Sequence, residues 1–267
     1  MLPGTNKILI IVPCYNEEKR FDSNYWRTII ADNPLVNFIF VNDGSSDRTL
    51  NKIGLIGFNS EVISLDKNSG KSEAIRQGWL QKISLFIDWK GFGFIDSDGA
   101  FSSKDVKNLI ELFSTLSTQN PNYDAILSSR VALAGRTIKR TKFRHYLGRV
   151  VSTFIIYSWP ESPYDTQSGF KLFSNTEYFH QAISKPFKTR WFFDIELLLR
   201  IKSYKKNSLN LWEEPLLHWT EIADSKITGF ELIRICKEVL TIKTEIGFTV
   251  RIKEEHGPTE RWRERSD

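Results

Sequence analysis

Short apolar runs alternate with longer mixed segments through the first half of the chain. Residues 7–13 (KILIIVP) form a β-branched apolar run, and similar runs return at residues 36–41, 61–65, 92–95 and 124–127. Apolar runs of this length are typical of strands that are buried on both faces of a parallel sheet. The pattern therefore predicts a strand at each run.

The segments between these runs have the length and mixed polarity of helices. We expect helices over residues 17–30, 46–56, 71–87 and 103–116. A strand followed by a helix, repeated along the chain, predicts an α/β fold with a parallel sheet covered on both faces. Ligands of such sheets bind beyond the carboxyl ends of the strands, so the loops after the strands are expected to carry the chemistry.

The alternation stops after residue 127. Residues 143–159 predict an aromatic helix, and a polar turn follows at residues 164–169. Residues 228–246 predict an amphipathic helix, because apolar residues recur there at three- and four-residue spacing, at Leu232, Ile235, Val239, Ile242 and Ile246. We expect one domain over residues 1–222, and in residues 223–267 an amphipathic helix with a polar tail, packed on that domain or on a membrane surface.

Composition narrows the class of protein. The chain has 267 residues, enough for one large α/β domain, and its 40% hydrophobic and 26% charged residues are values of an ordinary globular protein. The longest apolar stretch, residues 150–159, is shorter than the ~20 residues that span a bilayer. The first residues lack a secretion signal, and Cys14 and Cys236 are too few for a disulfide framework, so we expect a cytoplasmic protein.

The net charge of +5 is compatible with a nucleic acid, an anionic lipid or a phosphorylated ligand. The positive charge is concentrated between Arg130 and Arg149, a stretch without any acidic residue. This stretch predicts either a solvated basic loop or an anion site. The basic residues lack interleaved aromatic residues that would stack on bases, so we expect no nucleic-acid partner.

Polar residues follow each of the first four apolar runs. The stretches are Cys14–Glu18 (CYNEE), Asn42–Asp47 (NDGSSD), Asp66–Lys71 (DKNSGK) and Asp96–Gly99 (DSDG). In the last of them two carboxylates lie so close that their ionised forms require a cation. Mg²⁺ or Mn²⁺, shared with the phosphates of a ligand, would meet that need and stabilise a departing nucleoside diphosphate. A turn with a helix cap is the simpler alternative for this stretch taken alone.

Together the four motifs resemble glycosyltransferase family 2, inverting enzymes with the GT-A fold. The resemblance implies a Rossmann-like, mostly parallel central sheet flanked by helices, and it covers about residues 7–245. Within the family the chain is most similar to dolichyl- and polyprenyl-phosphate glucosyltransferases, through residues 96–100 (DSDGA), 129–130 (SR), 165–173 (DTQSGFKLF), 191–196 (WFFDIE) and 225–227 (SKI). Three positions depart from the family pattern, namely Asn42, Ser72 and Ser168, and the membrane helices of many relatives are missing.

The resemblance implies a role for each motif residue. The nucleoside would be held by Pro13, Tyr15, Glu17 and Asp43. The ribose, the metal ion and the diphosphate would be held by Asp96 and Asp98, and Lys71 would lie near phosphate or sugar. Simpler alternatives are a half-buried core side chain for Tyr15 and a solvated first-turn residue for Lys71.

The acceptor decides which further residues take part. In relatives that glycosylate a lipid phosphate, arginines hold the anion, and the matching residues are Arg130 and Arg144. A phosphate acceptor is already nucleophilic and needs no general base. A sugar hydroxyl would need a carboxylate to take its proton, and Asp194 and Asp165 are the candidates. Each has a structural alternative, a first-turn helix charge for Asp194 and a turn former for Asp165.

The expected function is therefore transfer of a hexose, in particular glucose, from a UDP-linked sugar to a polyprenyl or dolichyl phosphate. The resemblance further implies peripheral contact with the cytoplasmic face of a membrane, through helices over residues 143–159 and 228–246. Two alternatives remain at this point. One is extension of a saccharide acceptor in surface polysaccharide synthesis, and the other is a non-catalytic module that binds sugar nucleotides.

Overall fold

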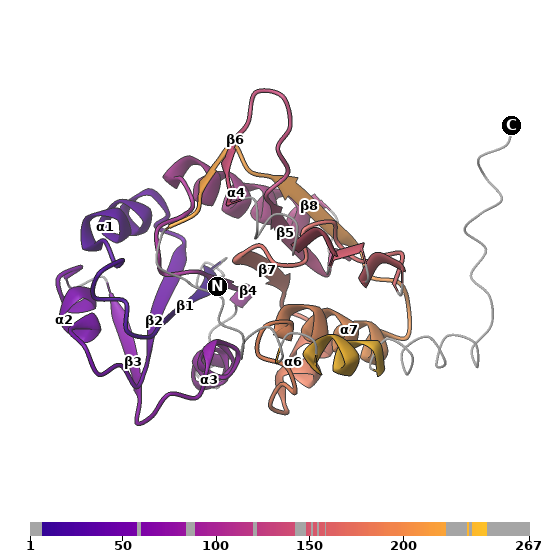
Figure 1. Ribbon diagram of the computed structural model, residues 1–267, viewed down its shortest axis with the longest axis horizontal. Helices are drawn as coiled ribbons and strands as arrows, with labels where there is room; N and C mark the ends of the chain where they lie inside the picture. The colour runs from indigo at the N-terminus through magenta and orange to yellow at the C-terminus, as the bar shows by residue number, and fades with distance from the viewer. Residues whose placement is uncertain are drawn as a thin grey trace, which may run out of the picture.

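The computed structural model describes residues 7–57, 60–83, 89–119, 122–141, 148–150, 152–153, 155–157, 159–222, 234 and 237–244. The central sheet has the strand order β3-β2-β1-β4-β7-β5-β8 (Figure 1). Its strands are β1 (Lys7–Cys14), β2 (Val36–Asp43), β3 (Glu61–Leu65), β4 (Trp89–Ile95), β5 (Ala125–Ser129), β7 (Phe170–Ser174) and β8 (Leu211–Pro215). Only β7 runs antiparallel to its neighbours, so the predicted mostly parallel sheet is confirmed.

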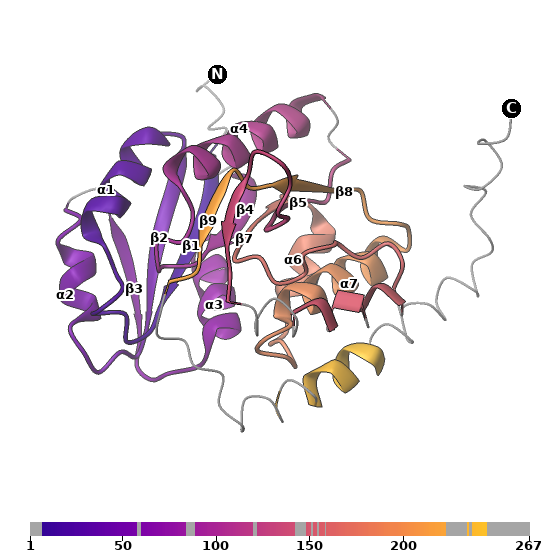
Figure 2. The ribbon, with the colours of Figure 1, turned by 45° about the horizontal axis from the view of Figure 1, so that its top comes forward.

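Helices cover both faces of this sheet. One face packs against α1 (Ser23–Asp32), α2 (Thr49–Gly54) and α4 (Ser103–Gln119), and the other against α3 (Lys71–Ile83), α6 (Glu177–Ile183) and α7 (Phe193–Lys205). Alternation along β1 explains the two layers, since Leu9 and Ile11 belong to one core and Ile8 and Ile10 to the other. A small second sheet pairs β6 (Thr137–Lys139) with β9 (His218–Thr220) (Figure 2).

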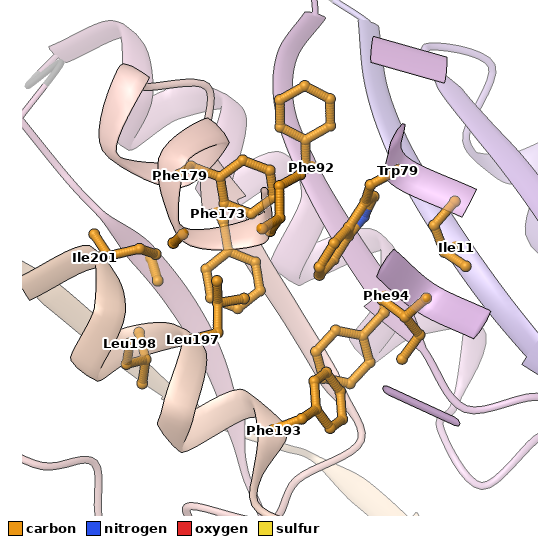
Figure 3. Packing of buried hydrophobic residues seen from close by; sticks show 14 of the residues in the cluster. Ile11, Trp79, Phe92, Phe94, Phe173, Phe179, Phe193, Leu197, Leu198 and Ile201 are labelled. Carbon is orange, nitrogen blue, oxygen red and sulfur yellow. The ribbon is translucent and has the colours of Figure 1, made fainter. Parts of the chain in front are cut away.

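The core on the α3, α6 and α7 side is aromatic (Figure 3). Trp79 of α3 packs edge-on against Phe173 and Phe179, and its indole N–H donates to the Gly93 carbonyl at 3.0 Å. Phe92 stacks on Phe179 with ring centroids 4.9 Å apart. Aromatic pairs of this geometry add to the stability gained from burial. The core therefore fixes the end of β4, where the acid pair follows.

The structure differs from the sequence predictions at the start of the first helix and at a strand that was not predicted. The first helix begins at Ser23 rather than at residue 17, because the Asp22 side chain accepts the backbone N–H groups of Asn24 and Tyr25 and so caps it. Strand β7 was not predicted, because Lys171 interrupts its apolar run. β7 inserts between β4 and β5, and it brings the polar turn before residue 170 to the carboxyl edge of the sheet.

Residues 237–244 form a helix beside α7, drawn in yellow in Figures 1 and 2. Ile242 is buried and Val239 packs on the same core, so this part of the predicted apolar face contacts the protein itself. Leu240, in contrast, is 63% exposed. Leu232, Ile235 and Ile246 lie outside the described residues. Within the described ranges, no helix is both long enough and apolar enough to cross a bilayer.

Candidate active site

The loops after β1 and β2 are bonded to each other. The Asn16 side chain accepts the Ser46 N–H at 2.9 Å, and the Asn16 N–H donates to the Ser45 hydroxyl at 3.1 Å. The Asp47 carboxylate accepts the Glu18 N–H at 3.0 Å. These contacts join the first two motifs, so Asp47 is a structural residue of the site.

The loop after β3 is held by Asp43 at the end of β2. The Asp43 carboxylate accepts the N–H groups of Ser69 at 2.7 Å and Gly70 at 2.8 Å. Gly70 has a φ of +91°, a left-handed conformation that side chains rarely adopt. The second and third motifs therefore form one unit, with the Asp43 side chain at the cavity wall.

The motifs surround a cavity of about 630 Å³ at the carboxyl edge of the sheet, a size typical of small-ligand sites. Most of the predicted site residues line this cavity, namely Pro13, Tyr15, Glu17, Asp43, Lys71, Asp96, Asp98, Arg130 and Asp194. Asp165 is not a lining residue, but it contacts Arg130, which is. Arg144 lies outside the described residues.

The acid pair after β4 has the electrostatics expected of a cation site. Burial raises the pKa of Asp98, and the charge of Asp96 raises it further. The Lys71 ammonium lies 2.5 Å from Asp96 Oδ1 and partly neutralises the pair. In the described ranges, no group of three His, Cys, Asp or Glu side chains is arranged to hold a metal ion. The carboxylates thus fit Mg²⁺ or Mn²⁺ only if ligand oxygens complete the shell.

Glu17 presents an unpaired oxygen inside the site. Its Oε1 pairs with Arg20 at 2.5 Å, but its buried Oε2 has no hydrogen-bond partner among the described residues. Burial raises the pKa of Glu17, and Asp98 and Asp96 add to that rise, although Arg20 opposes it. A buried oxygen without a partner is the expected acceptor for a ligand hydroxyl.

Gly169 sets the position of Asp96. The Asp96 N–H donates to the Gly169 carbonyl at 3.0 Å, and a Cβ at residue 169 would lie 2.1 Å from Asp96 Oδ2. Real Cβ atoms do not approach this closely, so any side chain at this position would displace the carboxylate. The glycine before β7 therefore belongs to the acid site.

We expect Gly169→Ala to lower kcat/KM by about 100-fold, because displacement of the Asp96 carboxylate from its position in the site costs catalysis far more than it costs folding. Gly54→Ala is the matched control, since a Cβ at Gly54 meets nothing within 4 Å. Both variants should unfold within a few degrees of the wild type in a thermal melt. Full activity of Gly169→Ala would show that the carboxylate position does not matter.

Arg130 and Asp165 form a buried ion pair. The guanidinium donates from Nε at 2.7 Å and from Nη2 at 2.8 Å, and the Arg130 backbone N–H adds a third bond at 2.8 Å. Burial alone would raise the pKa of Asp165, but Arg130 outweighs it and holds that pKa well below its usual range. A carboxylate held in this way is a weak base, which disfavours the general-base role considered for Asp165.

Asp194 is also paired with a buried cation. Its carboxylate contacts the Lys171 ammonium, which is 0% exposed and also donates to the carbonyls of Ser168 at 2.6 Å and Thr166 at 3.2 Å. A fully buried lysine is stable only with such partners. Asp194 therefore fixes the turn before β7 as well as lining the cavity.

Several lining residues were not predicted to belong to the site. Trp219 lies under the Arg130 guanidinium at 5.2 Å, on β9, a strand too short to leave a pattern. Three cationic residues, Arg20, Arg190 and Arg234, also line the cavity, and a fourth, Arg140, lies in the basic stretch considered as an anion site. The sequence offered one usable signal, the Arg190-Trp191 pair just before the predicted acid Asp194. Lys171, adjacent to the site, was visible as a charge inside an apolar run.

A cavity with an acid pair, at the carboxyl edge of a mostly parallel sheet, defines an α/β protein of the nucleotide-binding class. The model of the family described as Glycosyl transferase family 2 matches residues 9–179. The chain therefore belongs to glycosyltransferase family 2, and it is a glycosyltransferase.

Two proteins with assigned activities are similar to this chain over most of its length. The dolichyl-phosphate beta-glucosyltransferase of Homo sapiens is 31% identical over 264 residues, which cover 90% of this chain and 75% of the relative. The dolichyl-phosphate beta-glucosyltransferase of Drosophila melanogaster is 31% identical over 245 residues, which cover 84% and 70%. The resemblance found in the motifs is therefore confirmed over most of the chain.

A solved structure confirms the fold. Glucosyl-3-phosphoglycerate synthase from Mycobacterium tuberculosis, crystallised with Mn²⁺, UDP-glucose and phosphoglyceric acid, matches with a TM-score of 0.65 at 19% identity. The match covers 91% of this chain and 80% of that chain. At this identity the two proteins share an architecture, and the GT-A fold predicted from the sequence is confirmed.

Proposed function

We propose that this enzyme transfers glucose from UDP-glucose to a polyprenyl phosphate, with a divalent cation and with inversion at the anomeric carbon. The observation that carries the proposal is the pairing, in one cavity, of the Asp96 and Asp98 carboxylates with a surrounding set of cationic side chains. A nucleotide sugar and a phosphate acceptor need both features. The names of the relatives support glucose as the sugar and a dolichyl-type phosphate as the acceptor.

The donor would lie across the first three motifs. Tyr15 is 44% exposed at the cavity and offers a flat ring to the base, while Pro13 and Asp43 form the adjoining wall. The unpaired Glu17 Oε2 would accept a ribose hydroxyl. Asp96 and Asp98 would hold Mg²⁺ or Mn²⁺, which would supply Lewis-acid stabilisation of the leaving group. UDP-glucose and Mn²⁺ in the structurally similar synthase support this choice of donor and metal.

The chain's own residues would then organise a single displacement. An oxygen of the acceptor phosphate forms a bond to the anomeric carbon as the bond from that carbon to UDP breaks on the opposite face. Lys71, beside Asp96, is placed to neutralise charge on the departing diphosphate. No proton has to leave a phosphate dianion, so the ion-paired states of Asp165 and Asp194 are compatible with the reaction.

The acceptor would approach from a membrane surface. Two helical segments reach the cavity, since Gly148 and Arg234 both line it. Both carry exposed apolar side chains, with Tyr157 88% exposed and Leu240 63% exposed. Side chains of this kind favour the interface of a bilayer. We expect co-sedimentation with anionic vesicles to decrease when Tyr157 and Leu240 are both changed to Ser, whereas binding that is unchanged would contradict membrane contact there.

Product formation tests the proposed function. Purified protein, Mn²⁺ and radiolabelled UDP-glucose should yield a lipid-linked glucose with undecaprenyl phosphate, and no product with GDP-mannose. Added chelator should stop the reaction. Extension of a saccharide acceptor without any lipid-linked product would refute the assigned acceptor and favour a hydroxyl substrate, with Asp194 as its base.

A further inference from the structure

The arginines around the cavity are not equally available to a ligand. Arg20 pairs with Glu17, and Arg130 is committed to Asp165 in a bidentate pair. Among the described residues, Arg190 in contrast donates to a backbone oxygen, that of Ser69, at 3.1 Å. In the described part of the chain no carboxylate pairs with Arg190 or with Arg234, although both line the cavity.

The loop that carries Arg190 is fixed by two buried carboxylates. Glu196, 1% exposed, accepts the N–H groups of Lys188 at 3.0 Å and Thr189 at 2.9 Å. Glu238, 7% exposed, accepts the N–H of Trp191 at 2.7 Å. Buried carboxylates are costly unless such donors satisfy them. The backbone on both sides of Arg190 is therefore held in place before any ligand arrives.

The Arg190 guanidinium lies against the loop after β3. A Cβ at Gly70 would lie 2.9 Å from its Nε and Nη2 atoms, so the guanidinium occupies the space that a side chain at residue 70 would need. The next residue, Lys71, reaches the acid pair at Asp96. The arginine thus lies beside the part of the cavity where the diphosphate and the transferred sugar are proposed to bind.

The second arginine lies close to the C-terminal helix. Arg234 lines the cavity, and Glu238, four residues further along the chain, belongs to the helix of residues 237–244. Since Glu238 accepts the Trp191 N–H at 2.7 Å, this helix contacts the loop that carries Arg190. Two guanidinium groups that have no acidic partner among the described residues therefore line the same cavity.

We propose that Arg190 and Arg234 form a phosphate-binding wall of the cavity, positioned by Glu196 and Glu238. A planar guanidinium binds phosphate oxygens through two parallel hydrogen bonds, and an arginine not already paired gains most from that contact. The assignment rests on the proposed function and adds binding residues to it. Arg190 and Arg234 would bind the phosphate in place of Arg130, whose charge is already neutralised by Asp165. The bound group is either the diphosphate of the donor or the phosphate monoester of the acceptor.

Calorimetric titration of the full chain, with Mn²⁺ present, distinguishes the two groups. UDP is the probe for the donor, and citronellyl phosphate added to the UDP complex is the probe for the acceptor. We expect Arg190→Gln to weaken one of these two affinities by about 10- to 100-fold, with Arg190→Lys and Arg234→Gln between it and the wild type. Arg48→Gln, at an exposed arginine outside the cavity, should change neither affinity.

The supporting role of Glu238 has its own readout. Glu238→Ala should weaken the same affinity as Arg190→Gln, whereas Glu238→Gln, whose amide oxygen still accepts the Trp191 N–H, should restore it. A loss of stability alone would not be reversed in this selective way. Arg190→Gln and Arg234→Gln variants that fold and bind both probes with wild-type affinity would refute the assignment of these two arginines to phosphate binding. Wild-type protein that binds both probes but forms no lipid-linked glucose would refute only the proposed function.

Discussion

Asp98→Asn should lower kcat/KM on the order of 1,000-fold, the loss typical of removing an electrostatic group at a reacting centre. Asp98 shares its charge with Asp96, and both line the cavity where the leaving diphosphate is proposed to bind. An amide keeps the size and the hydrogen bond from Ala100 but removes the charge that is proposed to hold a cation. Steady-state kinetics with UDP-glucose and undecaprenyl phosphate measures the effect.

The same substitution should leave stability unchanged or raise it. The pKa of Asp98 is raised in the folded protein, so at neutral pH its ionised form is less favourable there than in the unfolded chain. Removing that charge removes an unfavourable contribution to the stability of the folded protein. Asp66→Asn is a matched control, since Asp66 is exposed at the end of β3 and does not line the cavity. An active Asp98→Asn enzyme, or one that is inactive because it unfolds, would contradict the assigned role.

Asp165→Asn should lower the free energy of unfolding by about 3–5 kcal/mol, the cost of leaving a buried charge without its partner. The charge left behind is that of Arg130, whose guanidinium is packed between Asp165 and Trp219. Glu18→Gln is the control, because Glu18 pairs with an exposed Arg48 at 3.3 Å and such pairs contribute about 0–1 kcal/mol. Denaturant unfolding compares the two variants, and equal small losses would contradict a structural role for the buried pair.

This pair also predicts a pH dependence with a definite sign. The pKa of Asp165 is lowered in the folded protein, so below its unfolded value of about 3.9 the unfolded state binds the proton first. The stability that the pair contributes is therefore present at neutral pH and lost as the pH falls below about 4. Asp165→Asn should show a shallower loss of stability over that acid range than the wild type.

The first half of the fold could be predicted well because the signals for its strands and loops lie within short stretches of the sequence. The runs that became β1, β2, β3 and β4 are continuous and apolar, and each ends in residues whose side chains need polar partners. Parallel strands bring such ends together, so a cavity shared by Tyr15, Asp43, Lys71 and Asp98 followed from the pattern. The motif resemblance then supplied the family.

The second half was less predictable because its key contacts join distant residues. Nothing local indicates that Arg130 will bond Asp165, or that Asp194 will meet Lys171, since each pairing depends on where the antiparallel β7 inserts. The Glu238 contact with Trp191 likewise requires the C-terminal helix to fold back onto α7. Asp165 and Asp194, which were considered as general bases, therefore form ion pairs in the structure.

The proposed function requires the acid pair at the end of β4 to bind a divalent cation together with the nucleotide. Calorimetric titration of UDP into the purified protein, once with Mn²⁺ and once with chelator, measures this coupling. Mn²⁺ should strengthen UDP binding by about tenfold or more, and UDP should strengthen Mn²⁺ binding by the same factor. UDP affinity that is the same with and without the cation would contradict this requirement.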